Sequence, residues 1–383
     1  MDFDYTDEQR LLKDSVDRLI ADRYGFEQRK KYIADDAGFS RELWAQYAEL
    51  GLLGLPFPEE YGGFGGGAVE TAIVMEAFGR GLVIEPYLAT VLLGGALVLA
   101  AGTPEQKQDI LPRVADGRTL LAFAHHERHA RYDLADVTTH AREHAGAWRI
   151  DGEKSLVLHG DAADTLIVPA RIAGNRRDRG GVALFLVDKN ATRLTPRFYR
   201  TQDNMRAAEI HLQGTPATPL GTATGSAFAI IERVVDRATA ALCAEAIGAM
   251  EALHAMTVDY LKTRKQFGRP IGDFQVLQHR AVDMFTALEQ ARSMALFAAV
   301  MAEDDNAEER TRAIAAAKVQ IGRSARHVGQ EAIQLHGGIA MTMEYAAGHY
   351  FKRLTMIDKT FGDADWHIAR LAAAGGLFAP KAA

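Results

Sequence analysis

A cluster of positive charge lies where a long apolar stretch of the chain ends. Lys262, Arg264 and Lys265 share one expected helical turn, and Gly268 and Pro270 then stop the helix. Cations in a last turn can simply complement the dipole of their own helix, and most charge clusters are solvated faces. The charges alone therefore do not distinguish a capped helix from a binding site.

A second candidate segment ends the last long helical stretch. Gln334 is followed by Gly337 and Gly338. Two residues without side chains let a backbone approach a phosphate closely. A glycine at this place is also the common C-cap of a helix, so both interpretations stay open on these residues alone.

The histidine-rich residues 125–129 invite a metal interpretation. His126, Glu127 and His129 are one residue short of the His-Glu-x-x-His order, and they fall where a strand or loop is expected rather than a helix. We therefore expect no metal site.

Two other conspicuous features are expected to be structural. The glycine-dense residues 58–67 lack the Gly-x-x-x-x-Gly-Lys-Ser/Thr order of a phosphate-binding loop, so we expect a flexible loop between helices. Met341, Met343 and Met356 are expected to fill a core rather than contact a cofactor.

The elements that must position these residues fall into three zones. Residues 1–118 are predicted to be helical, because the N-cap residues Thr6, Ser40 and Thr103 each precede an amphipathic run. In residues 119–222 the hydrophobic period shortens to that of strands. From residue 223 the helical pattern returns. The sequence predicts a strand and turn at 148–154 and strands at 165–168 and 182–187. The predicted long helices cover 225–265, 273–303 and 308–336.

Composition excludes several classes of protein. The 383 residues are 48% hydrophobic and 25% charged, as in ordinary globular proteins, and the net charge of −6 argues against a nucleic-acid surface. One cysteine, Cys243, allows no internal disulfide and favours a reducing, cytoplasmic location. The most apolar stretch, Leu88 to Ala101, is too short to span a bilayer, and we predict a buried helix there.

Taken together, the two candidate segments resemble the signatures of the acyl-CoA dehydrogenase family of flavoproteins. In the second segment, Gln334, Gly337 and Gly338 match the family's Gln-x-x-Gly-Gly. In the first, the matching residues are Tyr260, Arg264, Gln266, Phe267, Gly268, Pro270, Ile271, Phe274 and Gln275.

The resemblance implies a cofactor, its ligands and a fold. The cofactor is FAD, and the arginine of the first segment reaches the pyrophosphate of an FAD bound to a neighbouring subunit. The fold is α+β, mainly α, with an N-terminal helical domain (1–118), a middle antiparallel β domain (119–222) and a C-terminal four-helix bundle (223–383). The implied FAD ligands are Arg264, Gln266, Phe267, Gln275, Gln334, Gly337 and Gly338.

The residues with which family members hold their own flavin are replaced in this chain. The family's Thr-Glu-Pro-x-Ala-Gly-Ser-Asp segment falls on residues 126–133, where only Glu127 and Asp133 remain. The family's Trp-x-Thr falls on Leu156 and Leu158. A leucine cannot donate a hydrogen bond to a flavin nitrogen.

The family's catalytic base is also missing. In the family a glutamate removes the α-proton of an acyl-CoA while the β-hydrogen leaves as hydride. Its usual position holds Phe361, and the alternative position on the preceding helix holds Ala238. Asp363 or Asp365 could serve only if the loop shifts, so Asp363 is a fallback and no catalytic residue is assigned.

These patterns favour the non-catalytic subunit of a heteromeric FAD-dependent acyl-CoA dehydrogenase. The chain resembles the small subunits of two-subunit bacterial enzymes, such as the pimeloyl-CoA dehydrogenase small-subunit type. The resemblance implies an acyl-CoA substrate, a homologous catalytic partner in an α2β2 assembly, and electron-transfer flavoprotein as acceptor, with no nucleic-acid or membrane partner. Two alternatives stay open: a self-sufficient homotetramer that uses Asp363 or Asp365, and a silent acyl-CoA-binding scaffold.

Overall fold

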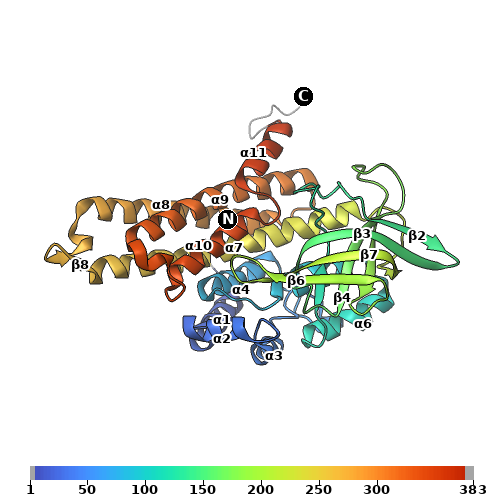
Figure 1. Ribbon diagram of the computed structural model, residues 1–383, viewed down its shortest axis with the longest axis horizontal. Coiled ribbons are helices and arrows are strands. Elements are labelled where there is room, and N and C mark those ends of the chain that lie inside the picture. Colours follow the sequence, from blue (N-terminus) through green and yellow to red (C-terminus); the bar gives the residue numbers. More distant parts are fainter. Residues whose placement is uncertain (1–4, 376–383) are drawn as a thin grey trace. The chain divides into compact units, whose positions relative to one another are not determined.

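The computed structural model describes residues 5–375, which form two compact units (Figure 1). Within this range, the first unit contains the residues up to Lys31, Ala68–Val83 and the residues from Thr239 onward. The second contains Tyr32–Gly67 and Ile84–Ala238. The boundary at residue 238 lies inside the long helix α7 (Phe228–Thr263).

The first unit is helical. Its long helices α8 and α9 lie side by side and pack on one another, and α9 also packs on α10 and α11 (Figure 1). Besides most of α7, the helices are α1 (Asp7–Arg23), α2 (Phe26–Ala34, which runs into the second unit), α4 (Ala68–Gly81), α8 (Gln275–Met301), α9 (Ala307–His336), α10 (Ala346–Lys359) and α11 (Ala364–Ala373).

Two glycines let α4 and α7 approach each other closely inside this unit. A Cβ atom at Gly79 would lie 1.9 Å from the carbonyl oxygen of Glu245, and one at Gly248 would lie 1.8 Å from that of Glu76. Any larger residue at either position would force the helices apart. The small residues therefore fix the depth at which α7 is buried.

The second unit is a sheet with helices. Its helices are α3 (Arg41–Glu49), η1 (Glu59–Tyr61), η2 (Leu88–Gly95), α5 (Ala96–Ala101) and α6 (Pro104–Ala115). Its strands are β1 (Leu121–Phe123), β2 (His140–His144), β3 (Ala147–Leu158), β4 (Thr165–Arg171), β5 (Val182–Asp188), β6 (Leu194–Arg200) and β7 (Arg206–Pro219).

The sheet closes on itself and encloses an apolar core. Its order is β1-β4-β2-β3-β7-β5, and β5 also pairs with β4, while β6 pairs with β7. Most pairs are antiparallel, as predicted, but β4 runs parallel to β1 and β2. Ile150, Phe185 and Ile210 are at most 1% exposed in the core, which alternating strand residues supply.

The predicted architecture is confirmed: helices, then a β region, then long helices. The three predicted long helices correspond to α7, α8 and α9 with ends shifted by up to three residues. The predicted caps at Thr6, Ser40 and Thr103 each accept a backbone hydrogen bond in the first turn of α1, α3 and α6. Of the expected buried helix at Leu88 to Ala101, Leu88–Gly95 is buried throughout, whereas Ala100 near its end is exposed.

One helix is long and apolar enough to cross a membrane by length and composition alone. It is α7, and 67% of its most apolar 18-residue window is buried inside the protein. The core helix of a globular protein has the same property.

Candidate functional site

The first candidate segment forms a hairpin at the end of α7. Arg264 follows the last residue of the helix, and β8 (Lys265–Gln266) pairs with β9 (Arg269–Pro270). The Ile271 amide donates to the Arg264 carbonyl at 2.8 Å and closes the hairpin. The hairpin follows from the turn residues, since Phe267 and Gly268 adopt φ values of +54° and +80°.

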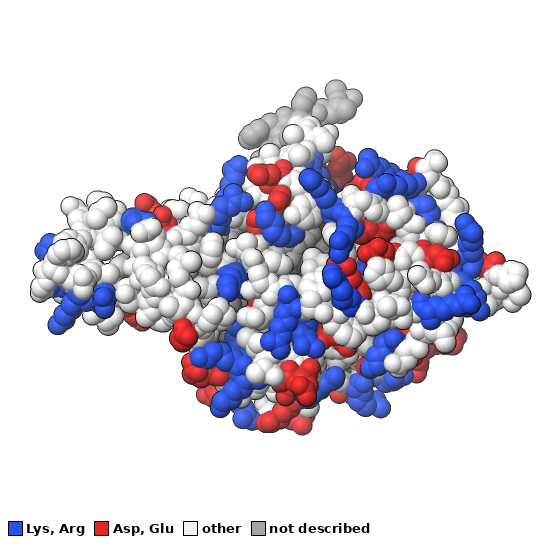
Figure 2. Space-filling model, in the orientation of Figure 1, with Lys and Arg blue, Asp and Glu red and all other residues white. Residues whose placement is uncertain are grey.

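The side chains of this hairpin point into solvent. Phe267 is 90% exposed, and Arg264 and Gln266 are exposed as well. Within residues 5–375, no carboxylate pairs with the Arg264 guanidinium. Lys262, Lys265 and Arg269 are exposed in the same segment and add to its charge. Blue atoms gather in Figure 2 at the end of the molecule where Figure 1 labels β8. An exposed guanidinium that no carboxylate neutralises is suited to bind a phosphate.

The second candidate segment ends α9 with an open backbone. Gly337 has φ +65° and ψ −144°, a conformation that essentially only glycine adopts. A Cβ atom at Gly337 or Gly338 would meet no atom within 4 Å, so the space around both residues is open. Gln334 is exposed one turn earlier. An anionic group could reach the backbone here without obstruction.

The structure brings the two segments together in the first unit. The Tyr260 ring lies 4.7 Å from the His336 ring between centroids, and Tyr345 packs on the same histidine at 5.1 Å. Arg280 Nε donates to Glu331 Oε2 at 2.5 Å and joins α8 to α9. Gln275, the first residue of α8, follows the hairpin. All seven FAD ligands implied by the resemblance belong to this unit, but as ligands they remain a prediction.

The expected base position lies in the turn between α10 and α11. Phe361 occupies it with φ +58°, which is uncommon for a bulky side chain. The ammonium group of Lys318, a fully buried residue of α9, holds this turn. Its Nζ lies 2.7–3.0 Å from four backbone carbonyl oxygens, those of Ile357, Asp358, Thr360 and Gly362.

The Lys318 anchor was not anticipated from the sequence. Burial lowers the pKa of Lys318 to about 8, although the surrounding carbonyls favour its protonated form. A lysine at a core-facing position of the alanine-rich α9 is the signal that could have revealed it.

The fallback base Asp363 already has two structural partners. Its Oδ1 accepts from the Trp366 amide at 3.0 Å as the N-cap of α11, and its Oδ2 lies 2.9 Å from Lys359 Nζ. Burial opposes ionisation, but Lys359 and the Trp366 amide outweigh it, so the pKa of Asp363 lies below its ordinary value. A carboxyl group held ionised by such partners is a poor proton acceptor at neutral pH. The other fallback, Asp365, is exposed in the first turn of α11.

The positions expected to hold the chain's own flavin lie in the second unit, on and beside β3. Leu156 and Leu158 are half-buried, and Leu156 adopts φ +49° where the β3–β7 register shifts. Neither side chain offers a hydrogen-bond donor. His126 Nδ1 lies 2.8 Å from the Ser155 hydroxyl, so that pair satisfies itself. Ala238, the alternative base position, is buried and offers no carboxylate.

Glu127 anchors the loop before β2 to β3 through a buried ion pair. Its Oε1 lies 2.7 Å from the Nζ of Lys154, and both residues are at most 2% exposed. The Thr138 amide donates to its Oε2 at 2.9 Å. Burial alone would raise the pKa of Glu127, but Lys154 and Thr138 outweigh burial and lower it to about 2. Glu127 is thus a structural carboxylate here.

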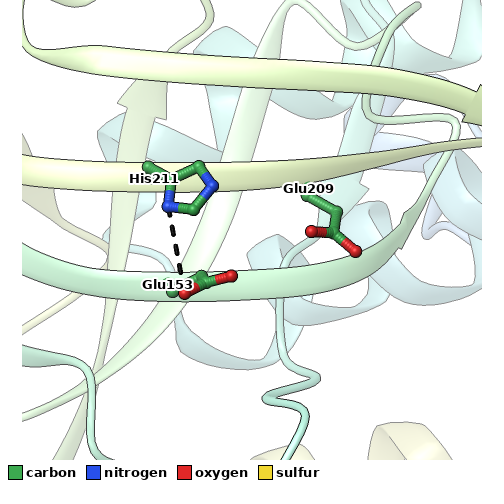
Figure 3. Close-up of side chains that lie close together, drawn as sticks. All are labelled: Glu153, Glu209 and His211. Carbon is green, nitrogen blue, oxygen red and sulfur yellow. Dashed lines mark ion pairs between the residues drawn. The ribbon is translucent and has the colours of Figure 1, made fainter.

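One histidine and two carboxylates also meet on the outer face of the sheet (Figure 3). His211 Nδ1 lies 3.9 Å from Glu153 Oε2 across β7 and β3, and Glu209 is near both. Both oxygens of Glu209 lie within 2.7 Å of Arg128 Nη2, however. This guanidinium already occupies the carboxylate that a cation would need.

In the 125–129 stretch, His125 stacks on Phe123, and burial lowers the pKa of His125 to about 3.

Comparison with known proteins decides the family. Sequence models of the acyl-CoA dehydrogenase N-terminal, middle and C-terminal domains match residues 6–118, 122–214 and 225–375. The acyl-CoA dehydrogenase IpdE2 of Mycobacterium tuberculosis is 33% identical, with 91% of each chain covered. The chain belongs to the acyl-CoA dehydrogenase family. The probable acyl-CoA dehydrogenase YngJ of Bacillus subtilis is 30% identical over 98% of this chain and all of that protein.

Solved structures share the fold closely. A variant of the Tcur3481-Tcur3483 steroid enzyme matches with a TM-score of 0.86 and 29% identity, covering 96% of this chain and 97% of that one. The ChsE4-ChsE5 complex of Mycobacterium tuberculosis matches with a TM-score of 0.86 and 25% identity, covering 97% and 98%. Each of these names combines two components.

FAD is the cofactor of this acyl-CoA dehydrogenase family, in which it accepts the hydride. The described residues suit the diphosphate part of FAD but not its flavin ring. The exposed Arg264 guanidinium and the open backbone at Gly337 and Gly338 suit a diphosphate. Leu156 and Leu158 do not suit the polar edge of a flavin ring, because they donate no hydrogen bond.

Proposed function

We propose that this acyl-CoA dehydrogenase chain is the non-catalytic subunit of a two-subunit enzyme. It completes the FAD site of a homologous partner, which carries out the α,β-desaturation of an acyl-CoA thioester. One observation carries the proposal: the Arg264 segment is intact and exposed, whereas Phe361 stands where the base should be and Asp363 is committed to capping α11.

The replaced flavin-contacting positions support the same conclusion. Leu156 and Leu158 leave β3 without the donors that would orient a flavin on this chain. Loss of both the base and these donors is expected when selection for chemistry on this chain is relaxed. The segments that serve another chain's cofactor keep the residues that such a role needs.

The exposed face of α8 supports association with another subunit. One set of its exposed positions follows the 3–4 spacing of a helix-packing stripe, and no residue of this set is charged. These residues, which we call the α8 stripe, are Val282, Thr286, Gln290, Ser293, Phe297 and Val300. The exposed stripe of neighbouring α9 is polar by contrast, with Arg323, His327, Gln330 and Gln334.

The proposal includes a substrate, an assembly, an electron acceptor and a location. The substrate is an acyl-CoA, the assembly is α2β2, electron-transfer flavoprotein takes the electrons, and the enzyme works in the cytoplasm. Similar structures whose names combine two components support the assembly.

The test measures flavin per chain. The chain is purified alone and together with an acyl-CoA dehydrogenase encoded beside it that has the glutamate and the Trp-x-Thr segment. We expect no flavin on the chain alone and about one flavin per pair of subunits on co-expression. Stoichiometric flavin on the chain alone, reducible by an acyl-CoA, would instead establish the homotetramer. No flavin in either preparation would favour the silent scaffold.

A matched pair of variants assigns the flavin to the Arg264 segment. Arg264→Gln removes the guanidinium, and we expect flavin retention by the pair to fall by about tenfold to hundredfold, the cost of one charge-assisted contact to a phosphate. Lys265→Gln removes a neighbouring exposed charge and should change retention little. Equal losses in both variants would show a general effect of charge rather than a specific ligand.

A further inference from the structure

The loop that follows the double glycine exposes two methionines. Met341 is 75% exposed and Met343 is 52% exposed, and Ile339 beside them is 42% exposed. Every other methionine in the described range is buried or half-buried; Met75 and Met284, for example, are at most 2% exposed. The expectation that Met341 and Met343 fill a core was therefore wrong. Met356 is half-buried.

The position of these methionines is fixed while their thioethers stay open. They belong to or follow the turn η4 (Gly337–Met341). The Met343 carbonyl lies 3.1 Å from His349 Nε2, which ties the loop to α10. The Met343 sulfur lies 3.5 Å from Lys352 Nζ, a weak contact for a thioether. The exposure of both side chains makes them accessible to a dissolved oxidant.

Resting on the proposed function, we propose that Met341 and Met343 form a peroxide-responsive modification site that controls docking of the flavin-bearing subunit. The two residues lie in the loop that begins with Gly337 and Gly338, so we infer that a partner whose FAD reaches that backbone also covers this loop. Exposed apolar side chains beside a binding segment are what a partner buries. The partner thus protects the thioethers in the assembled enzyme, and the free chain leaves them open.

The oxidant is hydrogen peroxide, which a reduced flavin would supply if it passed two electrons and two protons to dioxygen. Each thioether sulfur then takes one oxygen atom from peroxide. The sulfur is oxidised by two electrons to the sulfoxide, the O–O bond breaks, and one water leaves. Methionine sulfoxide reductase reverses the change.

Oxidation would oppose docking for a simple physical reason. A sulfoxide is polar and its oxygen is a strong hydrogen-bond acceptor, so burying it against an apolar partner surface leaves that acceptor unsatisfied. In Met343 the new oxygen would also accept from Lys352 Nζ and bind the side chain back to α10. We expect affinity for the partner to fall by about tenfold to hundredfold.

The free chain is treated with hydrogen peroxide, and the added oxygen is located by peptide mass spectrometry. Assembly with the flavin-bearing partner is then measured by gel filtration and flavin content. We expect sulfoxide first at Met341 and Met343, weaker assembly, and recovery after methionine sulfoxide reductase. In the assembled enzyme, the same two residues should be oxidised several-fold more slowly.

Two double variants complete the test. Met341→Leu with Met343→Leu keeps the apolar volume without an oxidisable sulfur, so it should assemble normally and resist peroxide. Met256→Leu with Met294→Leu alters half-buried methionines and should remain sensitive. Unchanged assembly of the wild-type chain with both sulfoxides present would overturn the inference alone. If the untreated chain forms no flavin complex, the proposed function and this inference both fall.

Discussion

Asp363 illustrates how local hydrogen bonding decides what a carboxylate can do. As a residue type it could be a base, and it lies two positions from the family's usual glutamate. The Trp366 amide and Lys359 instead hold it ionised at the start of α11. Its role in this chain is to cap a helix.

We therefore expect Asp363→Ala to leave turnover of the assembled enzyme almost unchanged. Loss of the N-cap should lower the free energy of unfolding by about 1 kcal/mol, as measured by denaturant titration. Asp365→Ala, an exposed change in the same turn, should affect neither quantity. A fall in turnover of about a hundredfold or more on Asp363→Ala would show that this chain has chemistry of its own.

Among the elements, β3 is joined to the loop before β2 by a buried ion pair. Glu127 attaches the loop before β2 to β3 through Lys154, and the Thr138 amide also donates to the Glu127 carboxylate. The same loop segment contains the residues that resemble a flavin-binding segment. Retention of Glu127 is thus explained by structure, without a flavin on this chain.

The pKa of Glu127 gives this pair a defined pH dependence. It falls from 4.5 in the unfolded chain to about 2 in the folded one, so the unfolded state binds the proton more readily. Its contribution to stability is complete above about pH 4.5 and is lost as the pH falls towards about 2. Urea unfolding midpoints measured at neutral pH and again at about pH 3 should show this loss.

Glu127→Gln should remove that part of the acid slope and also destabilise the protein at neutral pH, since it leaves the Lys154 ammonium buried without a counter-charge. Glu153→Gln is the matched control, because Glu153 is about half exposed on the same strand. If wild type and Glu127→Gln lose stability in parallel on acidification, another group is responsible.

At the scale of the whole molecule, the chain presents surfaces that its described residues leave uncovered. The α8 stripe is uncharged, the hairpin projects exposed cations, and the loop after Gly338 exposes methionines. Monomeric proteins rarely expose large apolar surfaces of this kind. These surfaces fit an assembly in which other subunits cover them.

We expect Phe297→Asp to weaken assembly strongly, because it places a charge in the α8 stripe. Sedimentation of the co-expressed complex should show smaller species, with secondary structure unchanged by circular dichroism. Gln330→Asp, on the polar stripe of α9, should assemble normally. An intact complex with Phe297→Asp would place the interface elsewhere.

Much of the fold could be predicted because its signals are local. The caps at Thr6 and Thr103, the helical periodicity of α7 to α9 and the turn at Gly268 each depend on neighbours in the chain. The parallel pairing of β1 with β4 was missed, since pairing is a contact between distant residues. The exposure of Met341 was also missed, because exposure depends on which distant residues pack against a side chain.

The sequence by itself determined the family, the order of helical and β regions, and the loss of the base and flavin donors, because residue identity and spacing are sufficient for those statements. Only the tertiary structure decided that Asp363 caps α11, that Lys318 holds the turn at Phe361, and that the two candidate segments meet at Tyr260 and His336. The physical reason is that burial, ionisation and hydrogen bonding depend on atoms brought together by folding. A sequence shows which groups are present, whereas their partners come from distant parts of the chain.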